Sequence, residues 1–204
     1  MTGLRERQKA HRTRRILETS SQLFRQVGYG AVRIDDIARA AEISVGTFYN
    51  YFETKGDLLL AIVSMEVEEV HDFGKTLLAD PPADVARALA RLIGGYYDHS
   101  LVYLSKEMWR TAMAITIEAP ATRFSTRFTD LDRMLTDQVC ALLAELQRRA
   151  VVRPDIDTRA LGEVVFNNLN AMFIEFVKDD AMTLPQLNDC VARQNAPLAA
   201  LISC

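Results

Sequence analysis

The chain has 204 residues, of which 49% are apolar, and its 24 basic and 27 acidic side chains give a formal net charge of −3. This composition excludes a disordered chain, and the length allows one domain of ordinary size or a small domain joined to a larger one. No apolar run approaches the roughly 18 residues of a membrane-spanning helix. Three widely spaced cysteines indicate a reducing cytoplasm, and they predict neither a disulfide framework nor a zinc site.

Charge is distributed unevenly along the chain. Residues 1–56 hold ten basic and six acidic residues, a net charge of +4, whereas the remainder holds 14 basic and 21 acidic residues, a net charge of −7. A basic first segment followed by an acidic one favours two functions over one.

The first fifty residues read as three helices. Apolar residues recur at steps of three and four over residues 5–27, which predicts a long helix that stops at Gly28. A short helix follows over residues 34–41. Ser44 is a good N-cap, because its hydroxyl can accept a free amide proton of the first turn, and it predicts a third helix over residues 45–52.

The rest of the chain also has helical period. Thr54 and Asp57 form an approximate capping box at the start of a long helix, which ends before Pro81. The last helix is expected to be irregular at Pro197. Further helices are predicted over residues 85–97, 104–117, 124–146, 157–178 and 184–202. With no alternating strand, the fold is predicted to be all-α, about nine helices in total, with a three-helix head followed by a larger bundle.

Two short helices joined by a tight turn and packed on a longer helix describe a helix-turn-helix. The small Ala38 and Ala41 would let the second and third helices approach closely. Around two buried phenylalanines, the third helix shows short or planar groups that suit base edges and backbone oxygens: Val45, Thr47, Tyr49, Asn50 and Tyr51.

Residues 36–58 read DIARAAEISVGTFYNYFETKGDL. This run resembles the TetR (TetR/AcrR) family of bacterial transcriptional regulators, and the resemblance covers roughly residues 12–65. It implies a homodimer whose N-terminal heads bind a palindromic operator in double-stranded DNA. It also implies that a small molecule bound in the C-terminal bundle changes the spacing of the heads and releases the repressor.

The resemblance also implies a domain division and a set of site residues. Residues 1–56 would form the DNA-binding domain, with its motif at about 33–52, and residues 57–204 the ligand-binding and dimerisation domain. Tyr49 and Lys55 fall where the family usually contacts phosphate. The predicted DNA-binding residues are Arg33, Ser44, Val45, Gly46, Thr47, Tyr49, Asn50, Tyr51 and Lys55. The dimer surface would be the last two long helices, about 157–178 and 184–202.

The sequence departs from the family pattern at three positions. Arg33 stands where Thr is frequent, which loses a cap and adds a basic side chain. Glu42 stands where Gly is frequent, so the turn must accept an unfavourable backbone and a charge that repels phosphate. Tyr51 stands where His is frequent and keeps a hydrogen-bonding tip.

Two features leave alternatives open. Asn50 suits an adenine edge, and it equally suits solvent. The N-terminal bases form either a solvated helix face or a contact with the DNA backbone or minor groove; they are Arg5, Arg7, Lys9, Arg12, Arg14 and Arg15.

A ligand site in the second part of the chain is predicted mainly from aromatic and polar groups on apolar helix faces. The same residues suit ordinary core packing. The predicted set is Tyr96, Tyr97, His99, Trp109, Met113, Phe128, Phe166 and Asn170. Its composition suggests an apolar or amphipathic ligand. Asn168 lies among apolar residues and needs a partner, which is a ligand, a neighbouring helix or the other subunit.

Enzyme chemistry finds no support in the sequence. His11, His71 and His99 are too scattered for a metal site, and no nucleophile motif or phosphate-binding loop occurs, so no catalytic residue, metal or cofactor is predicted. The rival hypotheses are a small helical enzyme and a helical interaction module whose head does not bind DNA. Whether such a regulator activates or represses transcription stays open.

Overall fold

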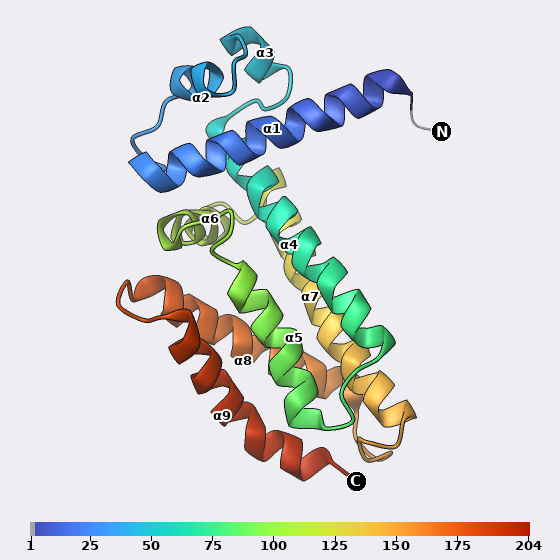
Figure 1. Cartoon of the computed structure of the whole chain (residues 1–204). Helices are drawn as coiled ribbons and strands as arrows, with labels where there is room; N and C mark the ends of the chain where they lie inside the picture. Colours follow the sequence, from blue (N-terminus) through green and yellow to red (C-terminus); the bar gives the residue numbers. More distant parts are fainter. Residues whose placement is uncertain (1–2) are drawn as a thin grey trace. The chain divides into compact units, whose positions relative to one another are not determined.

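The computed structural model describes residues 3–204, except the side chains of residues 4 and 5. Over this range the chain forms nine helices and no strand beyond one isolated bridge, which confirms the predicted all-α fold (Figure 1). The helices are α1 (Leu4–Val27), α2 (Ile34–Ala40), α3 (Val45–Tyr49), α4 (Lys55–Ala79), α5 (Val85–His99), α6 (Lys106–Glu118), α7 (Arg123–Arg148), α8 (Thr158–Lys178) and α9 (Leu184–Ile202). Within the described residues, no helix is both long and apolar enough to cross a membrane.

The predicted helix ends are confirmed where a specific residue stops or caps the helix. Gly28 has a φ of +92° and its amide donates to the Phe24 carbonyl, so it ends α1 in a backbone region that disfavours other residues. The Ser44 hydroxyl accepts from the Thr47 amide at 3.0 Å. At the start of α4, the Thr54 amide donates to Asp57 and the Asp57 amide donates back to the Thr54 hydroxyl.

The structure differs from the predicted helices in several details. Helix α3 ends at Tyr49 rather than Phe52, because the chain closes it with short turns in which the Asn50 and Tyr51 amides donate three residues back. Helix α6 begins at Lys106 rather than Leu104, since Ser105 is its N-cap. Helix α9 continues through Pro197 to its end, so the irregularity expected there does not divide the helix.

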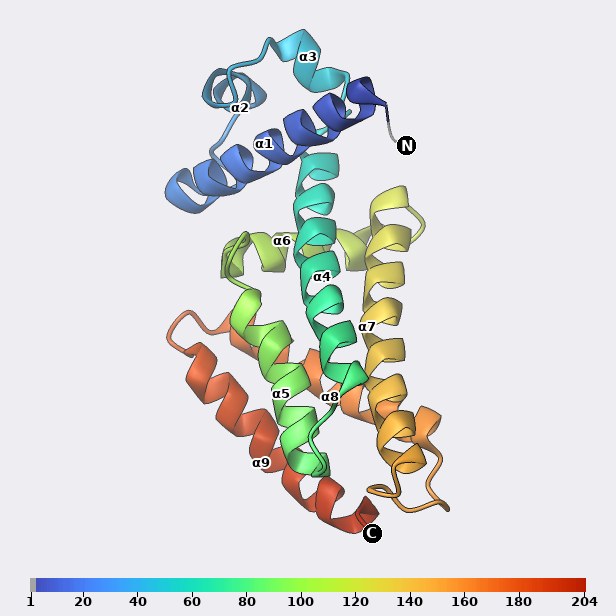
Figure 2. The same cartoon turned by 45° about the vertical axis from the view of Figure 1, so that its right-hand side comes forward.

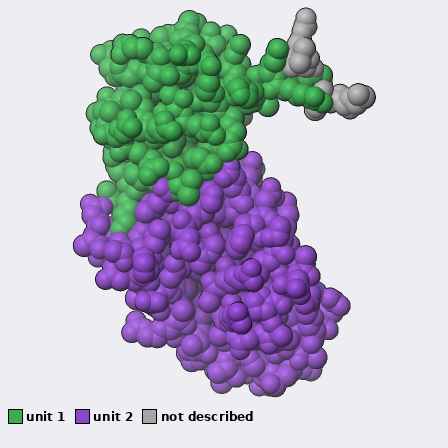
Figure 3. Space-filling model, in the orientation of Figure 1, with its two compact units in different colours: residues 1–65, 102–128 green, residues 66–101, 129–204 purple. Residues whose placement is uncertain are grey.

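The chain forms two compact units, coloured separately in Figure 3. Unit 1 comprises residues 1–65 and 102–128, and unit 2 comprises residues 66–101 and 129–204. Helices α4 and α7 each contribute to both units. These units do not follow the proposed functional boundary at residue 56, because the start of α4 and all of α6 group with the first three helices.

In unit 1, α2 and α3 lie together on one side of α1 (Figures 1 and 2). Its core contains fully buried Ile16, Phe24, Ile37 and Phe48. The segment before α6 is fastened to α1, because Arg25 donates to the Val102 carbonyl at 2.7 Å. Unit 1 is therefore larger than its first three helices.

In unit 2, polar side chains and small residues tie the helices together. The Tyr96 hydroxyl donates to Gln138 at 2.6 Å, and Gln138 donates to the His71 carbonyl at 2.8 Å, which links α5, α7 and α4. Helix α8 approaches α7 closely at Gly162, where an added Cβ would lie 2.5 Å from the Cys140 sulfur. Any larger residue at position 162 would force these two helices apart.

Candidate nucleic-acid interface

Helix α3 presents a small polar surface over a buried aromatic core. Phe48 is fully buried, and its ring packs edge-on against Tyr49 at a centroid distance of 5.6 Å and at a tilt against Phe52 at 5.7 Å. Tyr49 is 51% exposed although its ring rests on Phe48. The buried Phe48 thus anchors α3 in the core, while half of the Tyr49 side chain stays accessible.

The other residues predicted for this site, apart from Arg33 and Lys55, belong to α3 or flank its two ends. Ser44, Gly46 and Asn50 are exposed, and Val45, Thr47 and Tyr51 are partly exposed. A Cβ at Gly46 would meet only the Ser44 hydroxyl, at 3.9 Å, so the space before this residue is open. The structure therefore brings the predicted α3 residues onto one accessible element, with short side chains at its start and aromatic or amide groups at its end.

The Ser44 and Thr47 hydroxyls are bound to each other at 2.8 Å. Ser44 also accepts from the Thr47 amide, so its hydroxyl caps α3. Each hydroxyl oxygen keeps a further hydrogen-bonding position. The sequence predicted the Ser44 cap but not this second contact.

Lys55 lies within the head rather than on its rim. Its ammonium donates to the carbonyls of Tyr29 at 2.8 Å, Gly30 at 3.3 Å and Val32 at 3.0 Å, which uses all three of its protons. Burial lowers the pKa of Lys55, and the nearby Glu107 partly opposes this change. Phosphate contact by Lys55 stays a prediction, and it requires the loss of at least one of these bonds.

Two of the three departures from the family pattern, Arg33 and Glu42, are visible in the backbone. Arg33 is the N-cap of α2, where its amide donates to Asp36 at 3.1 Å while its side chain is exposed. Glu42 has a φ of +54°, in the left-handed region that favours glycine, which agrees with the strain expected at this turn.

The predicted ligand residues are distributed over both units. Trp109, Met113 and Phe128 belong to unit 1, whereas the other five belong to unit 2. Tyr96 and Tyr97 are buried, and their hydroxyls donate to Gln138 and to the Leu169 carbonyl, so both have core roles. Burial raises the pKa of both tyrosines, which keeps them neutral.

Of the other residues in this set, Phe166 is buried and Asn170 is partly exposed. His99 contacts two carboxylates of α4, with its Nδ1 2.6 Å from Glu66 and its Nε2 3.3 Å from Glu69. Glu66 is almost completely buried. The imidazole therefore bridges acidic groups, a partnership that the sequence did not indicate because 30 or more residues separate the groups.

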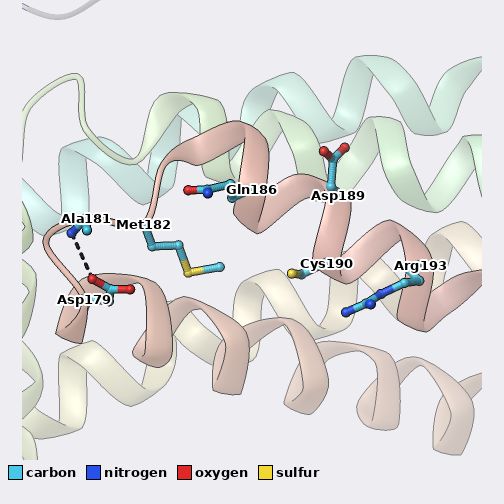
Figure 4. Close-up of a pocket in the computed structure, with 7 residues that line it drawn as sticks. All are labelled: Asp179, Ala181, Met182, Gln186, Asp189, Cys190 and Arg193. Carbon is cyan, nitrogen blue, oxygen red and sulfur yellow. Dashed lines mark hydrogen bonds between the residues drawn. The ribbon is translucent and has the colours of Figure 1, made fainter.

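A hollow of about 530 Å³ lies where α8 turns into α9 (Figure 4). The Met182 thioether and the Cys190 thiol point into the space between the two helices. None of the predicted ligand residues lines it. Its lining is Asp179, Ala181, Met182, Gln186, Asp189, Cys190 and Arg193. These residues follow no apolar periodicity, so pattern analysis had no signal with which to find them.

Asn168 joins the last two helices. Its amide donates to Gln194 of α9 at 3.0 Å, and Gln194 donates to the Met172 sulfur at 3.5 Å. Among the predicted alternatives, Asn168 thus has a neighbouring helix as partner. The same face of α8 exposes Val164 to 58%, while Val165 points into the core.

Comparison with known proteins places these features in context. A family model described as bacterial regulatory proteins, tetR family, matches residues 16–62. The repressor KstR of Rhodococcus jostii is 28% identical over 156 residues, which cover 76% of this chain and 67% of that protein. Several other curated regulators are matched over 17% to 39% of their own length.

Solved structures show the same fold. A regulator from Mesorhizobium loti has a TM-score of 0.74 at 18% identity, covering 96% of this chain and 98% of that one. FadR from Thermus thermophilus, a repressor solved with lauroyl-CoA, has a TM-score of 0.66 at 20% identity, covering 92% and 93%. At these identities the likeness concerns the fold alone.

Proposed function

Because the chain belongs to the TetR family of bacterial regulatory proteins, we propose that it is a homodimeric repressor that a small molecule releases from a palindromic operator. The observation that supports the DNA-binding part is the exposed end of α3, where Tyr49 packs on the buried Phe48 and Asn50 is the exposed C-cap. A rigid short helix with accessible polar tips suits the major groove of DNA.

The proposed dimer uses the exposed face of α8 and α9. Val164 and Leu201 are largely exposed there, and the Asn168–Gln194 bond holds the two helices side by side. A second copy would remove these apolar groups from water. Two recognition helices in a dimer would then lie about 34–36 Å apart to read successive major grooves.

The proposed regulation is a linkage between two binding sites. A ligand that prefers the dimer state with poorly spaced heads weakens DNA binding by the same factor by which DNA weakens ligand binding. The FadR neighbour binds an acyl-CoA, which agrees with the apolar or amphipathic ligand expected for this chain. Lauroyl-CoA is therefore the first probe.

The rival enzyme hypothesis has no support from the comparisons, since the matched family consists of regulatory proteins. If the chain were an interaction module that does not bind DNA, it would select no duplex by its sequence. Activation instead of repression depends on where the operator lies relative to the promoter, which a reporter fusion measures directly.

The test begins with selection of duplexes from a random pool by the full-length protein. Enrichment of a palindrome supports the proposal, and loss of binding by Tyr49→Ala assigns it to α3. Fluorescence anisotropy with the selected duplex then measures release by lauroyl-CoA, with free coenzyme A as the control. Failure to enrich any sequence would overturn the DNA-binding proposal.

A further inference from the structure

The exposed face of α1 carries a row of basic side chains that lies outside the recognition helix. Arg7, Gln8, His11, Arg12 and Arg15 line a hollow of about 490 Å³ on this helix. Their spacing of one, three or four residues places them on one face over more than two turns. All five side chains are exposed.

Two arginines of this row are not neutralised by the fold. Within the described part of the chain, neither Arg7 nor Arg12 makes an ion pair. By contrast, Arg14 on the same helix pairs with Glu18 at 2.8 Å, and the Glu6 carboxylate accepts from the Gly3 amide at the helix start. Like charges one turn apart destabilise a helix slightly, so an anion would stabilise this face.

One member of the row connects it to the helix-turn-helix. Arg15 donates to the carbonyl of Ala41 at 2.8 Å, and Ala41 is the C-cap of α2, where the turn to α3 begins. In Figures 1 and 2, the N-terminal end of α1 extends beyond α3. The basic row therefore begins at Arg15, beside the turn between α2 and α3, and continues along α1 toward its N-terminal end.

We propose that Arg7, His11, Arg12 and Arg15 bind phosphates of the DNA backbone next to the bases that α3 contacts. This inference rests on the proposed DNA-binding function and deepens it. Guanidinium groups bind phosphate oxygens through paired hydrogen bonds, and such contacts add affinity without base specificity. The row increases affinity and fixes how the head sits on the duplex, and α3 supplies the choice of sequence.

The test compares the double variant Arg7→Gln/Arg12→Gln with the matched control Arg87→Gln/Arg91→Gln, which removes two exposed arginines from α5 in unit 2. Glutamine preserves helix propensity, so circular dichroism should show equal helix content in both variants. Binding to the duplex selected by the wild type is measured from about 50 to 200 mM salt, the range over which phosphate contacts change affinity strongly.

We expect the slope of log K against log salt to become shallower by about 3.6 in the α1 variant, since the proposed dimer loses two phosphate contacts in each protomer and each lost contact removes about 0.9. The ratio of affinities for the selected and a scrambled duplex should stay unchanged, as should every value for the control.

Two results would overturn the inference. An unchanged slope means that the row does not touch phosphate, and a lower ratio of selected to scrambled affinity means that it reads bases in the minor groove. Both outcomes differ from failure of the proposed function, in which the wild type itself selects no sequence.

Discussion

The ammonium nitrogen of Lys55 lies 2.8 Å from the carbonyl oxygen of Tyr29 and 4.5 Å from the centre of the Tyr29 ring. The start of α4 is thereby fastened to the loop that follows α1. Phe24 in turn packs edge-on against the Tyr29 ring at 5.0 Å. The head thus depends on a cation held by carbonyls and an aromatic face.

Replacing Lys55 with Met should therefore destabilise the protein. Three carbonyls lose a charged donor and the ring loses its cation, and we expect a loss of about 2 kcal/mol in the free energy of unfolding. Urea denaturation measures this value. Lys75→Met is the matched control, because Lys75 only pairs with Asp72 on an exposed face, and a surface pair of this kind contributes little. Equal effects of both substitutions would contradict the structural role of Lys55.

Tyr49 offers a way to separate the ring from the hydroxyl. Tyr49→Phe keeps the packing on Phe48, so the unfolding free energy should hardly change, whereas loss of a phosphate hydrogen bond should weaken operator binding by about tenfold. Tyr49→Ala should weaken it further. Anisotropy with the selected duplex is the measurement, and full affinity in Tyr49→Phe would remove the hydroxyl from the interface.

Glu42 combines two unfavourable features that two substitutions distinguish. Glu42→Gly relieves the left-handed backbone and should stabilise the protein by about 1 kcal/mol. Glu42→Ala keeps the strained backbone and should give no such gain. Both variants remove a negative charge beside the recognition helix, so both should bind DNA more tightly at low salt. A gain in stability from Glu42→Ala would show that the charge of Glu42, and not its left-handed backbone, destabilises this turn.

Asp132 on α7 should make stability depend on pH. Burial raises the pKa of its carboxyl to about 6, above its unfolded value near 3.8. The folded state therefore prefers the protonated form, and this group's contribution is lost as pH rises from about 4 to 6. Asp132→Asn should be more stable than the wild type by about 2 kcal/mol at pH 7.5, a value reduced for partial solvent screening.

The advantage of Asp132→Asn should shrink as the pH falls toward 4. Denaturation at a series of pH values checks this, with Asp130→Asn as the control two residues away. An advantage that does not vary with pH would mean that the asparagine acts through packing instead of charge.

The dimer surface is best tested at Val164. Because this side chain is 58% exposed in the protomer, Val164→Glu should fold normally yet sediment as a monomer and bind the operator more weakly. Ile117→Glu, at a residue 79% exposed in unit 1, should leave the sedimentation unchanged. Phe173 is unsuitable for this purpose, since it is buried and stacks on Tyr97 at 6.0 Å, so a charge there would damage the core of unit 2.

Periodicity and capping chemistry predicted most of the fold. Gly28, Ser44 and Thr54 act within three or four residues, so their effects are readable in the local sequence. The end of α3 was predicted wrongly because Phe48 and Phe52 have helical spacing, although the backbone has already left the helix at Asn50. Spacing specifies a common side of the chain, not a continuous hydrogen-bond ladder.

The site was less predictable, because its contacts join distant residues. The carbonyls that hold Lys55 belong to residues 29, 30 and 32, and the carboxylates near His99 belong to α4. Val164 and Val165 fit the same apolar pattern, yet only Val165 enters the core. A sequence indicates the kind of group at each position, and tertiary packing decides which of two neighbours meets a partner.

The close approach of α7 and α8 at Gly162 has a chemical consequence for Cys140. The thiol is buried against the neighbouring helix, and this burial raises its pKa although Arg159 acts in the opposite direction. Little thiolate forms, so Cys140 should resist oxidants and alkylating reagents that need the anion. Helix packing thus lowers the reactivity of Cys140, and thiol labels should react with Cys190 and Cys204 instead.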